Sequence, residues 1–342
     1  MEARAIREAI RRVVDREDLD EQSAAEAMEE VMQGLATPAQ VAGLAIALRM
    51  KGETVDEVVG AARVLREHVT RVDAGPGPVV DTAGTGGDAS GTFNVSTTAA
   101  LLAAAAGAKV AKHGNRSVSS RSGSADVLAA LGVRIDAPVP VVERCIQEVG
   151  IGFLFAPALH PALGHAAAPR RELGVRTLFN LLGPLANPAF ADRQVVGVFD
   201  KRWVEPIAEV LLKLGTRHAW VVHGSDGLDE LTLTGVTHVS EVRDRTVHSF
   251  RITPDQVGLN PCQLADLEGG DPETNAAITR RILEGERGPK ADMACLNAAA
   301  ALLVSGKAED LQDGVEQVRE AIRSGRALET LNALVRVSQS DR

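Results

Sequence analysis

Residues 79–97 read VVDTAGTGGDASGTFNVST, and the order of residue types in this stretch indicates the kind of fold. A short β-branched run is followed by a glycine-rich turn, and residues 94–97 then lead into alanines and leucines that predict a helix over about 96–106. The N–H groups at a helix start have no partner within the helix, so such a strand–turn–helix unit attracts phosphate. The stretch therefore predicts an α/β fold with an anion-binding turn.

The glycine pattern of this turn formally resembles a dinucleotide-binding fingerprint. That fingerprint also requires an acidic residue about 20 positions further on. Residues 103–110 read AAAAGAKV and contain no acid, which excludes dinucleotide binding, and no Gly-Lys-Ser/Thr follows to make a P-loop. A tight turn with a helix cap would explain one or two of the glycines and polar side chains, but not all of them. We therefore predict a phosphate site of another kind.

The alternation of strands and helices continues beyond this unit. Further short apolar runs are separated by helical segments and lie at 109–112, 152–155, 194–199 and 218–224. Strands that alternate with helices predict a mostly parallel sheet. Residues 232–252 alternate apolar and polar side chains like an antiparallel excursion, and the chain from residue 273 onward is predicted to be helical.

The first 70 residues carry a different, all-helical pattern. Apolar residues recur at helical spacing in four short segments, and capping boxes at Thr37–Gln40 and Thr54–Glu57 predict two of the helix starts. A Gly/Pro connector at 72–80 then precedes the first strand. We expect a helical subdomain over 1–72 and an α/β domain over 73–342.

Composition restricts the classes of partner. The 342-residue chain carries a formal net charge of −9, which gives no overall attraction to nucleic acid or to an anionic membrane. Its three cysteines form no C-x-x-C pair, which argues against a disulfide framework and a zinc site and fits a reducing compartment. The N-terminus has no apolar signal region, and the longest apolar stretches are too short for a membrane span. We expect a soluble, cytoplasmic protein.

A second polar loop follows the next predicted strand. Residues 109–120 read KVAKHGNRSVSS, and a helix is predicted to begin near Ser124. Neighbouring parallel strands place both loops at the same carboxyl edge of the sheet, where open α/β folds bind ligands. A lone lysine or histidine here would usually be solvated. Two cations, an amide and three serines beside the glycine loop instead favour a ligand site.

Several of these motifs occur together in one known family. The combination comprises GTGGD at 84–88, N-x-S-T at 94–97, KHGNRSVSS at 112–120, His160-Pro161, RRELGVRTLFNLLGPLANPA at 170–189 and HGSDGLDE at 223–230. It resembles the anthranilate phosphoribosyltransferases of tryptophan biosynthesis, in register to about residue 335. The resemblance implies a nucleoside phosphorylase/phosphoribosyltransferase-like fold. It also implies transfer of the phosphoribosyl group of phosphoribosyl pyrophosphate (PRPP) to the amine of anthranilate, with release of pyrophosphate.

The resemblance also implies roles for particular residues. PRPP would be bound by Gly84, Gly87, Asp88, Thr92, Asn94, Val95, Ser96, Thr97, Lys112, His113, Gly114, Asn115, Arg116, Ser117, Ser119, Ser120 and Ser124. Anthranilate would meet Gly84, Asn115, His160 and Arg170, and two Mg²⁺ ions would be held by Ser96, Asp229 and Glu230. Lys112, Asn115 and Arg170 would be the catalytic residues. The family likeness further implies a homodimer formed through the helical subdomain, with part of 160–187 joining that subdomain in space.

Taken alone, several of these residues have plainer interpretations. An Asp-Glu pair after a glycine is more often a solvated helix start, and Arg170-Arg171-Glu172 is more often a charged helical face. Mg²⁺ nevertheless prefers one or two carboxylates plus ligand phosphates, and a guanidinium fork suits the carboxylate of an aromatic acid. In the segment before Arg170 the family more often has a Met–Lys pair and a Pro-Val, whereas this chain has ALGHAAAP at 162–169. The shape of the aromatic pocket is therefore open.

Three alternative functions remain at this stage. A nucleoside phosphorylase on the same fold would need a different base-reading loop. A phosphoribosyltransferase for another aromatic acid is compatible with the altered segment at 161–169. A nucleic-acid-binding paralogue would be expected to have a basic surface and degraded PRPP motifs, whereas this chain is acidic and its motifs are intact.

Overall fold

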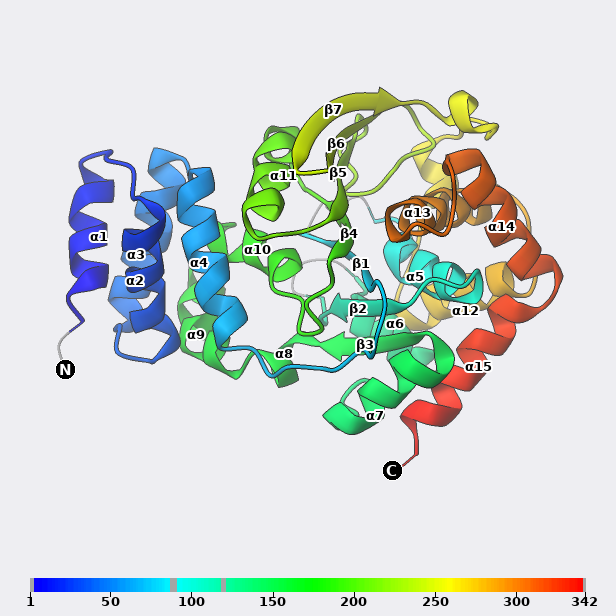
Figure 1. Cartoon of the computed structure of the whole chain (residues 1–342), viewed down its shortest axis with the longest axis horizontal. Helices are drawn as coiled ribbons and strands as arrows, with labels where there is room; N and C mark the ends of the chain where they lie inside the picture. Colours follow the sequence, from blue (N-terminus) through cyan, green and yellow to red (C-terminus); the bar gives the residue numbers. More distant parts are fainter. Residues whose placement is uncertain (1–2, 87–90, 118–120, 341–342) are drawn as a thin grey trace.

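A twisted sheet lies at the centre of the computed structural model, with a helical unit at one end (Figure 1). The structure describes residues 3–86, 91–117 and 121–340. The strands are β1 (Val80–Gly84), β2 (Val110–Gly114), β3 (Ile151–Phe155), β4 (Arg193–Gly197), β5 (His218–Gly224), β6 (Thr237–Arg243) and β7 (Thr246–Ile252). The helices are α1 (Ala5–Val14), α2 (Glu21–Met32), α3 (Pro38–Lys51), α4 (Val55–Glu67), α5 (Val95–Ala105), α6 (Ser124–Ala130), α7 (Val139–Arg144), α8 (Ala156–Leu159), α9 (Gly164–Leu173), α10 (Leu178–Leu182), α11 (Val204–Lys213), α12 (Pro272–Leu283), α13 (Pro289–Ser305), α14 (Leu311–Arg323) and α15 (Arg326–Ser338).

The strand order explains where a ligand can bind. Across the part of the chain that is described, the sheet runs β3-β2-β1-β4-β5-β6-β7. Strands β1 to β5 are parallel, and β6 and β7 add an antiparallel hairpin, so the predicted α/β fold with a mostly parallel sheet is confirmed. The chain moves outward from β1 to β3 on one side and then continues from β4 on the other side of β1. Such a reversal leaves a crevice at the carboxyl ends of the central strands.

The helical unit is built from α1 to α4 with α9 and α10. Both predicted capping boxes are present. The Thr37 and Thr54 side chains accept from the backbone N–H groups of Gln40 and Glu57, and the side chains of Gln40 and Glu57 accept from the backbone N–H groups of Thr37 and Thr54. Each cap is worth about 1 kcal/mol. Helix α9 packs on α2 and α3, and α10 packs on α3 and α4. One apolar cluster therefore joins these helices to the β4–β5 face of the sheet, with Phe179 among its members.

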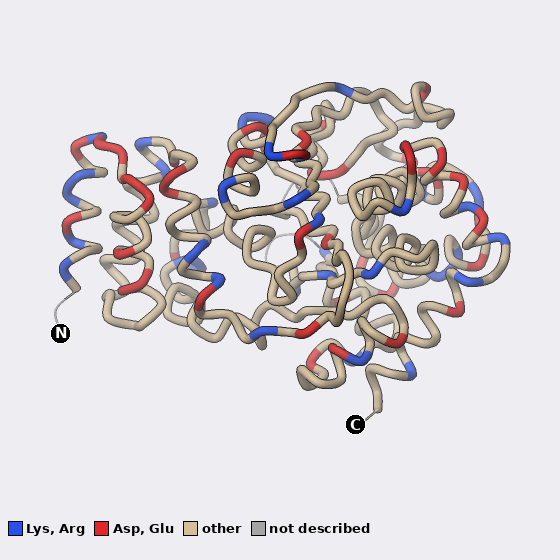
Figure 2. Tube along the Cα trace, in the orientation of Figure 1, with Lys and Arg blue, Asp and Glu red and all other residues tan. Residues whose placement is uncertain are grey.

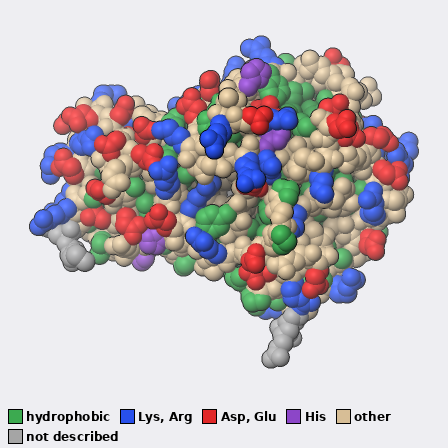
Figure 3. Space-filling model, viewed as in Figure 1, with side chains coloured by type: hydrophobic (Ala, Val, Ile, Leu, Met, Phe, Trp, Pro, Cys, Tyr) green, Lys and Arg blue, Asp and Glu red, His purple; other side chains and the backbone are tan. Residues whose placement is uncertain are grey.

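The other face of the sheet is covered by α5 and α13, and α14 and α15 pack on α5 (Figure 1). Helices α5 and α13 are buried almost all round, which an alanine-rich sequence permits because small side chains let helix backbones approach closely. In the described ranges no helix has the length and apolar character needed to cross a membrane. Acidic and basic residues alternate along the outer helices (Figure 2), and they are interspersed over the face shown in Figure 3.

The predicted element boundaries needed small corrections at the site. We expected the second strand to end at Lys112, but β2 continues through His113 to Gly114 because it pairs with β3 along its full length. The first strand likewise extends to Gly84, supported by β4. His113 is therefore a strand residue rather than a loop residue, and its side chain is buried.

Candidate active site

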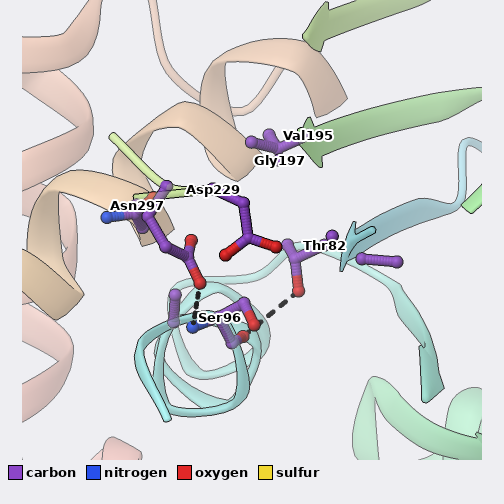
Figure 4. Close-up of a pocket in the computed structure, with 10 residues that line it drawn as sticks. Thr82, Ser96, Val195, Gly197, Asp229 and Asn297 are labelled. Atoms are coloured by element: carbon purple, nitrogen blue, oxygen red, sulfur yellow. Dashed lines mark hydrogen bonds between the residues drawn. The ribbon is translucent and has the colours of Figure 1, made fainter. Parts of the chain in front are cut away.

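The crevice between β1 and β4 is lined by bare backbone and two carboxylates. A pocket here is bounded by β1, the start of α5, β4 and the Asp229–Glu230 pair (Figure 4). A methyl group on Gly84 would lie 2.6 Å from Asp229 Oδ2, and one on Gly197 would lie 1.6 Å from the Asp229 carbonyl oxygen. Only glycine fits at these two strand ends, so the sequence lets Asp229 come directly against the sheet edge.

Backbone N–H groups hold both carboxylates in place. Gly86 N–H donates to Asp229 Oδ2 at 2.8 Å, and Ser96 N–H donates to Glu230 Oε1 at 3.1 Å. Glu230 thus sits at the N-terminus of α5, where the helix dipole favours a negative charge. The next residue, Leu231, donates its N–H to Asn297 Oδ1 at 3.0 Å and accepts from Asn297 Nδ2 at 2.9 Å. The acidic pair is therefore fixed from the first loop and from α13.

The donor set suits a hard cation. Ser96, Asp229 and Glu230, the three predicted ligands, line the same pocket and offer oxygen atoms, which Mg²⁺ prefers. Over residues 3–86, 91–117 and 121–340 there is no cluster of three or more His, Cys, Asp or Glu side chains placed to hold a metal. Two carboxylates and a hydroxyl fit an ion that takes its remaining ligands from phosphate or water.

The remaining first-loop residues differ in what they contact. Asn94 bridges the site, because its Nδ2 donates to Ser122 O at 3.2 Å and its Oδ1 accepts from Asn275 Nδ2 at 2.8 Å. Thr92 pairs with Glu268 in an isolated bridge. Val95 and Thr97 are buried in the first turn of α5, and Thr97 Oγ1 has no hydrogen-bond partner in the described structure. The predicted PRPP residues Gly87 and Asp88 lie outside the described residues.

Lys112 and His113 bring charge and hydrogen-bonding groups into the sheet itself. The buried Lys112 ammonium donates to Thr82 O at 2.6 Å. Burial lowers the pKa of Lys112, while Asp81, Glu230 and Asp229 oppose that shift. His113 Nδ1 lies 3.1 Å from Gly183 O. Since a carbonyl only accepts, we assign the proton to Nδ1, which leaves His113 Nε2 as an acceptor.

The structure brings His160 against His113, which the sequence did not predict. The two Nε2 atoms are 3.0 Å apart, so His160 Nε2–H is the donor in this tautomer assignment. Burial, and the neighbouring His160, lower the pKa of His113 to about 3, and burial lowers the pKa of His160 to about 4. Both rings are therefore neutral at pH 7, and His160 is a buried partner of His113 as well as a residue next to the altered segment.

The second loop turns tightly from β2 into α6. A methyl group on Gly114 would lie 2.2 Å from Ser124 Oγ, and Ser124 donates to Asn115 O at 3.3 Å. Asp126, which the sequence did not indicate, closes the loop by accepting from Arg116 Nη1, Ser117 N and Gly123 N. Ser119 and Ser120 lie outside the described residues. The loop residues that are described therefore form one short unit at the end of β2.

Arg170 lies on the last turn of α9. Its guanidinium carbon lies 5.6 Å from the centre of the Phe179 ring, and burial lowers its pKa. In the part of the chain that is described, no carboxylate pairs with it. Pro169 stands inside the helix directly before it. A half-buried guanidinium stacked on an aromatic ring and lacking an acidic partner is suited to bind an anionic ligand.

Comparison with known proteins places this architecture in a family. Residues 7–69 match a glycosyl transferase family helical bundle domain, and residues 76–328 match a glycosyl transferase family a/b domain. The anthranilate phosphoribosyltransferase of Syntrophotalea carbinolica is 52% identical, in an alignment spanning 98% of this chain and 99% of that protein. The chain belongs to the anthranilate phosphoribosyltransferase family. The family predicted from the motifs is thus confirmed.

Solved structures of family members show the same fold along the whole chain. The anthranilate phosphoribosyltransferase of Thermus thermophilus is 47% identical with a TM-score of 0.92, covering 97% of this chain and 99% of that one. The enzyme of Saccharomyces cerevisiae, in complex with PRPP and Mg, is 27% identical with a TM-score of 0.88, covering 97% of each chain. The helical unit and the sheet are therefore arranged as in enzymes of this family.

Proposed function

We propose that this chain transfers the phosphoribosyl group of PRPP to the amine of anthranilate, giving N-(5-phosphoribosyl)anthranilate and pyrophosphate in tryptophan biosynthesis. The observation that carries the proposal is the arrangement at the β1 edge. Asp229 and Glu230 are fixed there by the first loop, and their charges oppose the lowering of the pKa of the buried Lys112 on β2. An acidic pair and a buried ammonium beside glycine turns suit a magnesium–pyrophosphate group.

The two loops would bind the PRPP molecule between them. Gly84 and Gly86 expose backbone at the end of β1, and the N-terminus of α5 presents Ser96 to the same crevice. Asn94 ties this crevice to the second loop through Ser122. The residues of both loops that the family resemblance assigns to PRPP would supply its contacts.

Two Mg²⁺ ions would be held by Ser96, Asp229 and Glu230 together with phosphate oxygens. Bound magnesium would supply charge neutralisation for the departing pyrophosphate. The protein's own contribution is to fix the two carboxylates through Gly86 N–H and Ser96 N–H before any ion arrives. Such pre-organisation removes the cost of arranging the ligands during the reaction.

The chemistry requires placement more than acid–base catalysis. The aromatic amine is already neutral at pH 7, so no nucleophilic side chain and no strong base are needed. The bond from nitrogen to C1′ forms as the bond to pyrophosphate breaks, with inversion at that carbon, and the nitrogen gives up one proton to water or to the released pyrophosphate. Lys112 stabilises the leaving oxygens, and Asn115 and Arg170 orient the amine and the carboxylate of anthranilate. His160 lies next to the 161–169 segment that shapes this end of the site.

A substrate panel tests the proposal against its alternatives. The protein is incubated with PRPP and Mg²⁺ plus anthranilate or one of several other aromatic acids, and separately with thymidine or uridine plus phosphate. Product masses identify the reaction. We expect phosphoribosylanthranilate and pyrophosphate from anthranilate, at the highest kcat/KM of the panel. Preference for another acid would overturn the substrate assignment, and nucleoside phosphorolysis would overturn the reaction class.

We further propose that the chain forms a homodimer through its helical unit, comprising residues 1–72 and part of 160–187. An apolar groove runs across this unit, lined by Val13, Val14, Ala42, Ile46, Met50 and Leu173. Val14 is 64% exposed and Met50 69% exposed. A two-fold contact places the same patch on both partners, so projecting side chains of one copy can fill the groove of the other. Leu173 of α9 extends the patch, which supports the inclusion of 160–187.

The oligomeric state tests this interface directly. Val14→Glu combined with Met50→Glu introduces buried like charges into a self-complementary contact, so we expect sedimentation to change from dimer to monomer. Arg243→Glu with Arg245→Glu, at the turn between β6 and β7 and outside the helical unit, is the control and should remain dimeric. A wild-type monomer at micromolar concentration, or a dimer unaffected by the groove charges, would contradict the proposal.

The three unpaired cysteines support a cytoplasmic location.

A further inference from the structure

Strand β1 pairs very differently with its two neighbours. With β4 it shares five register positions, from Val80 opposite Arg193 to Gly84 opposite Gly197, and Thr85 N–H adds a bond to Gly197 O at 2.8 Å. With β2 it shares one position, Val80 opposite Val110. Strand β2 is fully paired with β3 on its other side. The two strands that carry the ligand loops therefore separate after their first residues.

Regular parallel pairing would continue with two further bonds. They would run from Thr82 N–H to Ala111 O and from His113 N–H to Thr82 O. Three side chains occupy these groups instead: Asn187 Nδ2 donates to Ala111 O at 2.8 Å, Lys112 Nζ donates to Thr82 O at 2.6 Å, and Asp81 Oδ1 accepts from His113 N at 3.0 Å. Thr82 N–H interacts with the Asp81 carboxylate. We call the Asp81, Lys112 and Asn187 side chains the polar wedge.

The members of the polar wedge also hold one another. Asn187 Nδ2 donates to Asp81 Oδ2 at 2.7 Å, so both of its N–H groups are used, while its Oδ1 accepts from Ala189 N at 2.8 Å. Asp81 is fully buried and Asn187 is 3% exposed. Both N–H groups of Asn187 thus meet an acceptor, which fixes the Asp81 and Asn187 side chains between the strands.

We propose that Asp81 and Asn187 are positioning residues that hold the carboxyl ends of β1 and β2 apart and thereby set the places of Lys112 and His113 in the active site. Neither residue lines the crevice that holds Asp229 and Glu230. They act through β2, because Asp81 fixes the His113 backbone and Asn187 fixes the Ala111 backbone on either side of Lys112. The inference deepens the proposed phosphoribosyl transfer and rests on it for its catalytic consequences.

The polar wedge is costly for the fold, which argues for a functional reason. Burial raises the pKa of Asp81 to about 6, although Lys112 and the hydrogen bonds from Asn187 and His113 counteract the shift. The groups that face the carboxylate are Lys112 and His113 on β2, the Thr82 backbone on β1 and Asn187. A continuous ladder with apolar side chains would avoid burying this charge. Closing the ladder would also remove the bond that now holds the Lys112 ammonium to Thr82.

The test uses an exchange of donor and acceptor. Asp81→Asn puts an amide N–H against either His113 N–H or Asn187 Nδ2, and Asn187→Asp puts two carboxylates together. The double variant D81N/N187D restores a matched donor and acceptor between positions 81 and 187 and leaves Ala111 O as the group without its partner. Ser338→Ala, which removes a buried hydroxyl bonded to Arg134 N far from the site, is the control.

Three measurements are made on each full-length protein: PRPP affinity by calorimetry with Mg²⁺, kcat and KM for both substrates, and amide exchange over residues 110–117. We expect D81N to lose at least tenfold in PRPP affinity and in kcat, with faster exchange over 110–117, because one of the two groups that donate to Asp81 loses its acceptor. The double variant should recover at least tenfold in kcat over N187D. The control should match the wild type in all three measurements.

The proposal is overturned if D81N retains wild-type affinity, kcat and exchange, or if the losses of the double variant equal the product of the single losses. Should N187D fail to fold, D81N alone decides through the same readouts. Failure of the proposed function has a different signature, because the wild type itself would then show no turnover. Exchange over 110–117 would still respond to D81N in that case.

Discussion

The two sides of β1 differ in how they meet the ligand crevice. On the β4 side the ladder is complete, glycine stands at both strand ends, and backbone N–H groups hold Asp229 and Glu230 against the edge. On the β2 side the ladder stops after one position, and buried side chains fill the opening. A fully paired strand edge can hold metal and phosphate ligands rigidly, whereas an interrupted strand pair leaves room for a cationic side chain inside the sheet. One strand can thus provide two different kinds of binding surface.

The largest effect is expected on the closed side. Replacing Asp229 and Glu230 by Asn and Gln removes both negative charges and leaves the shape, so turnover with PRPP and anthranilate should fall by about 1,000-fold or more at any practical Mg²⁺ concentration. Glu309→Gln with Asp310→Asn changes an adjacent acidic pair that is remote from the crevice and should leave kcat unchanged. Normal turnover by the first double variant would refute the metal assignment.

A single methyl group should disturb the closed side almost as much. In Gly84→Ala the new carbon lies 2.6 Å from Asp229 Oδ2, so the carboxylate must move. A displacement of about 1 Å at a reacting site can cost about a hundredfold, and we expect that loss in kcat/KM for PRPP. Gly43→Ala on α3, where the nearest atom lies 3.8 Å away, is the matched control. Equal activity of the two variants would show that the close approach has no function.

Arg170 tests the anthranilate end of the site. A charge-assisted hydrogen bond is worth about 1.5–3 kcal/mol, so Arg170→Ala should raise KM for anthranilate about ten- to hundredfold with little change in KM for PRPP. Arg171→Ala, the adjacent exposed arginine, serves as the control. Equal losses for both substrates would remove Arg170 from the anthranilate pocket.

The smallest expected effect is on stability and concerns the open side. The pKa values of His113 and His160 are lowered to about 3 and about 4, so the unfolded chain binds protons that the folded chain excludes, and stability falls as the pH drops below about 6.5. At pH 5 the loss in the free energy of unfolding is roughly 2 kcal/mol for each histidine. Burial raises the pKa of Asp81 to about 6, so protonation of Asp81 stabilises the fold as the pH falls from about 6 to about 4. This gain offsets part of the stability lost through the histidines.

Melting temperatures measured between pH 7 and pH 5 check this expectation. The wild type should lose stability on acidification, and His160→Gln should lose about half as much, because one of the two buried rings no longer titrates. Glu241→Gln is the control, because Glu241 pairs with His218 at the far end of the sheet. This variant should keep the pH dependence of stability that comes from His113 and His160. A melting temperature independent of pH in the wild type would contradict the assignment of two neutral, buried histidines.

Much of this arrangement could be predicted from local sequence. The four N-terminal helices, the strand–turn–helix unit at 79–97 and the hairpin after residue 232 follow from periodicity, capping boxes and turn residues, which act over a few positions. The acidic pair at 229–230 could be assigned only through the family resemblance, because an Asp-Glu dipeptide alone is usually solvated. Its neighbours Gly84 and Gly197 become meaningful only once the sheet order is known.

The open side of β1 could not be predicted in this way. Asp81 and Asn187 are 106 positions apart, and whether a strand pair continues or stops depends on side chains from a third segment. A charged residue inside a short buried strand, as Asp81 is in β1 and Lys112 is in β2, was the available signal. The same holds for Asn297 on α13, Asn275 on α12 and Asp126 on α6, whose partners lie in loops that pack on them only in the folded protein.

The fluorescence of anthranilate gives a decisive test of phosphoribosyl transfer at this site. The purified wild type is mixed with anthranilate and Mg²⁺, and PRPP is added while the emission is followed. We predict a steady loss of anthranilate fluorescence that requires PRPP, with stoichiometric release of pyrophosphate. An unchanged signal, with PRPP shown to be active in the same cuvette by a second enzyme, would contradict phosphoribosyl transfer to anthranilate.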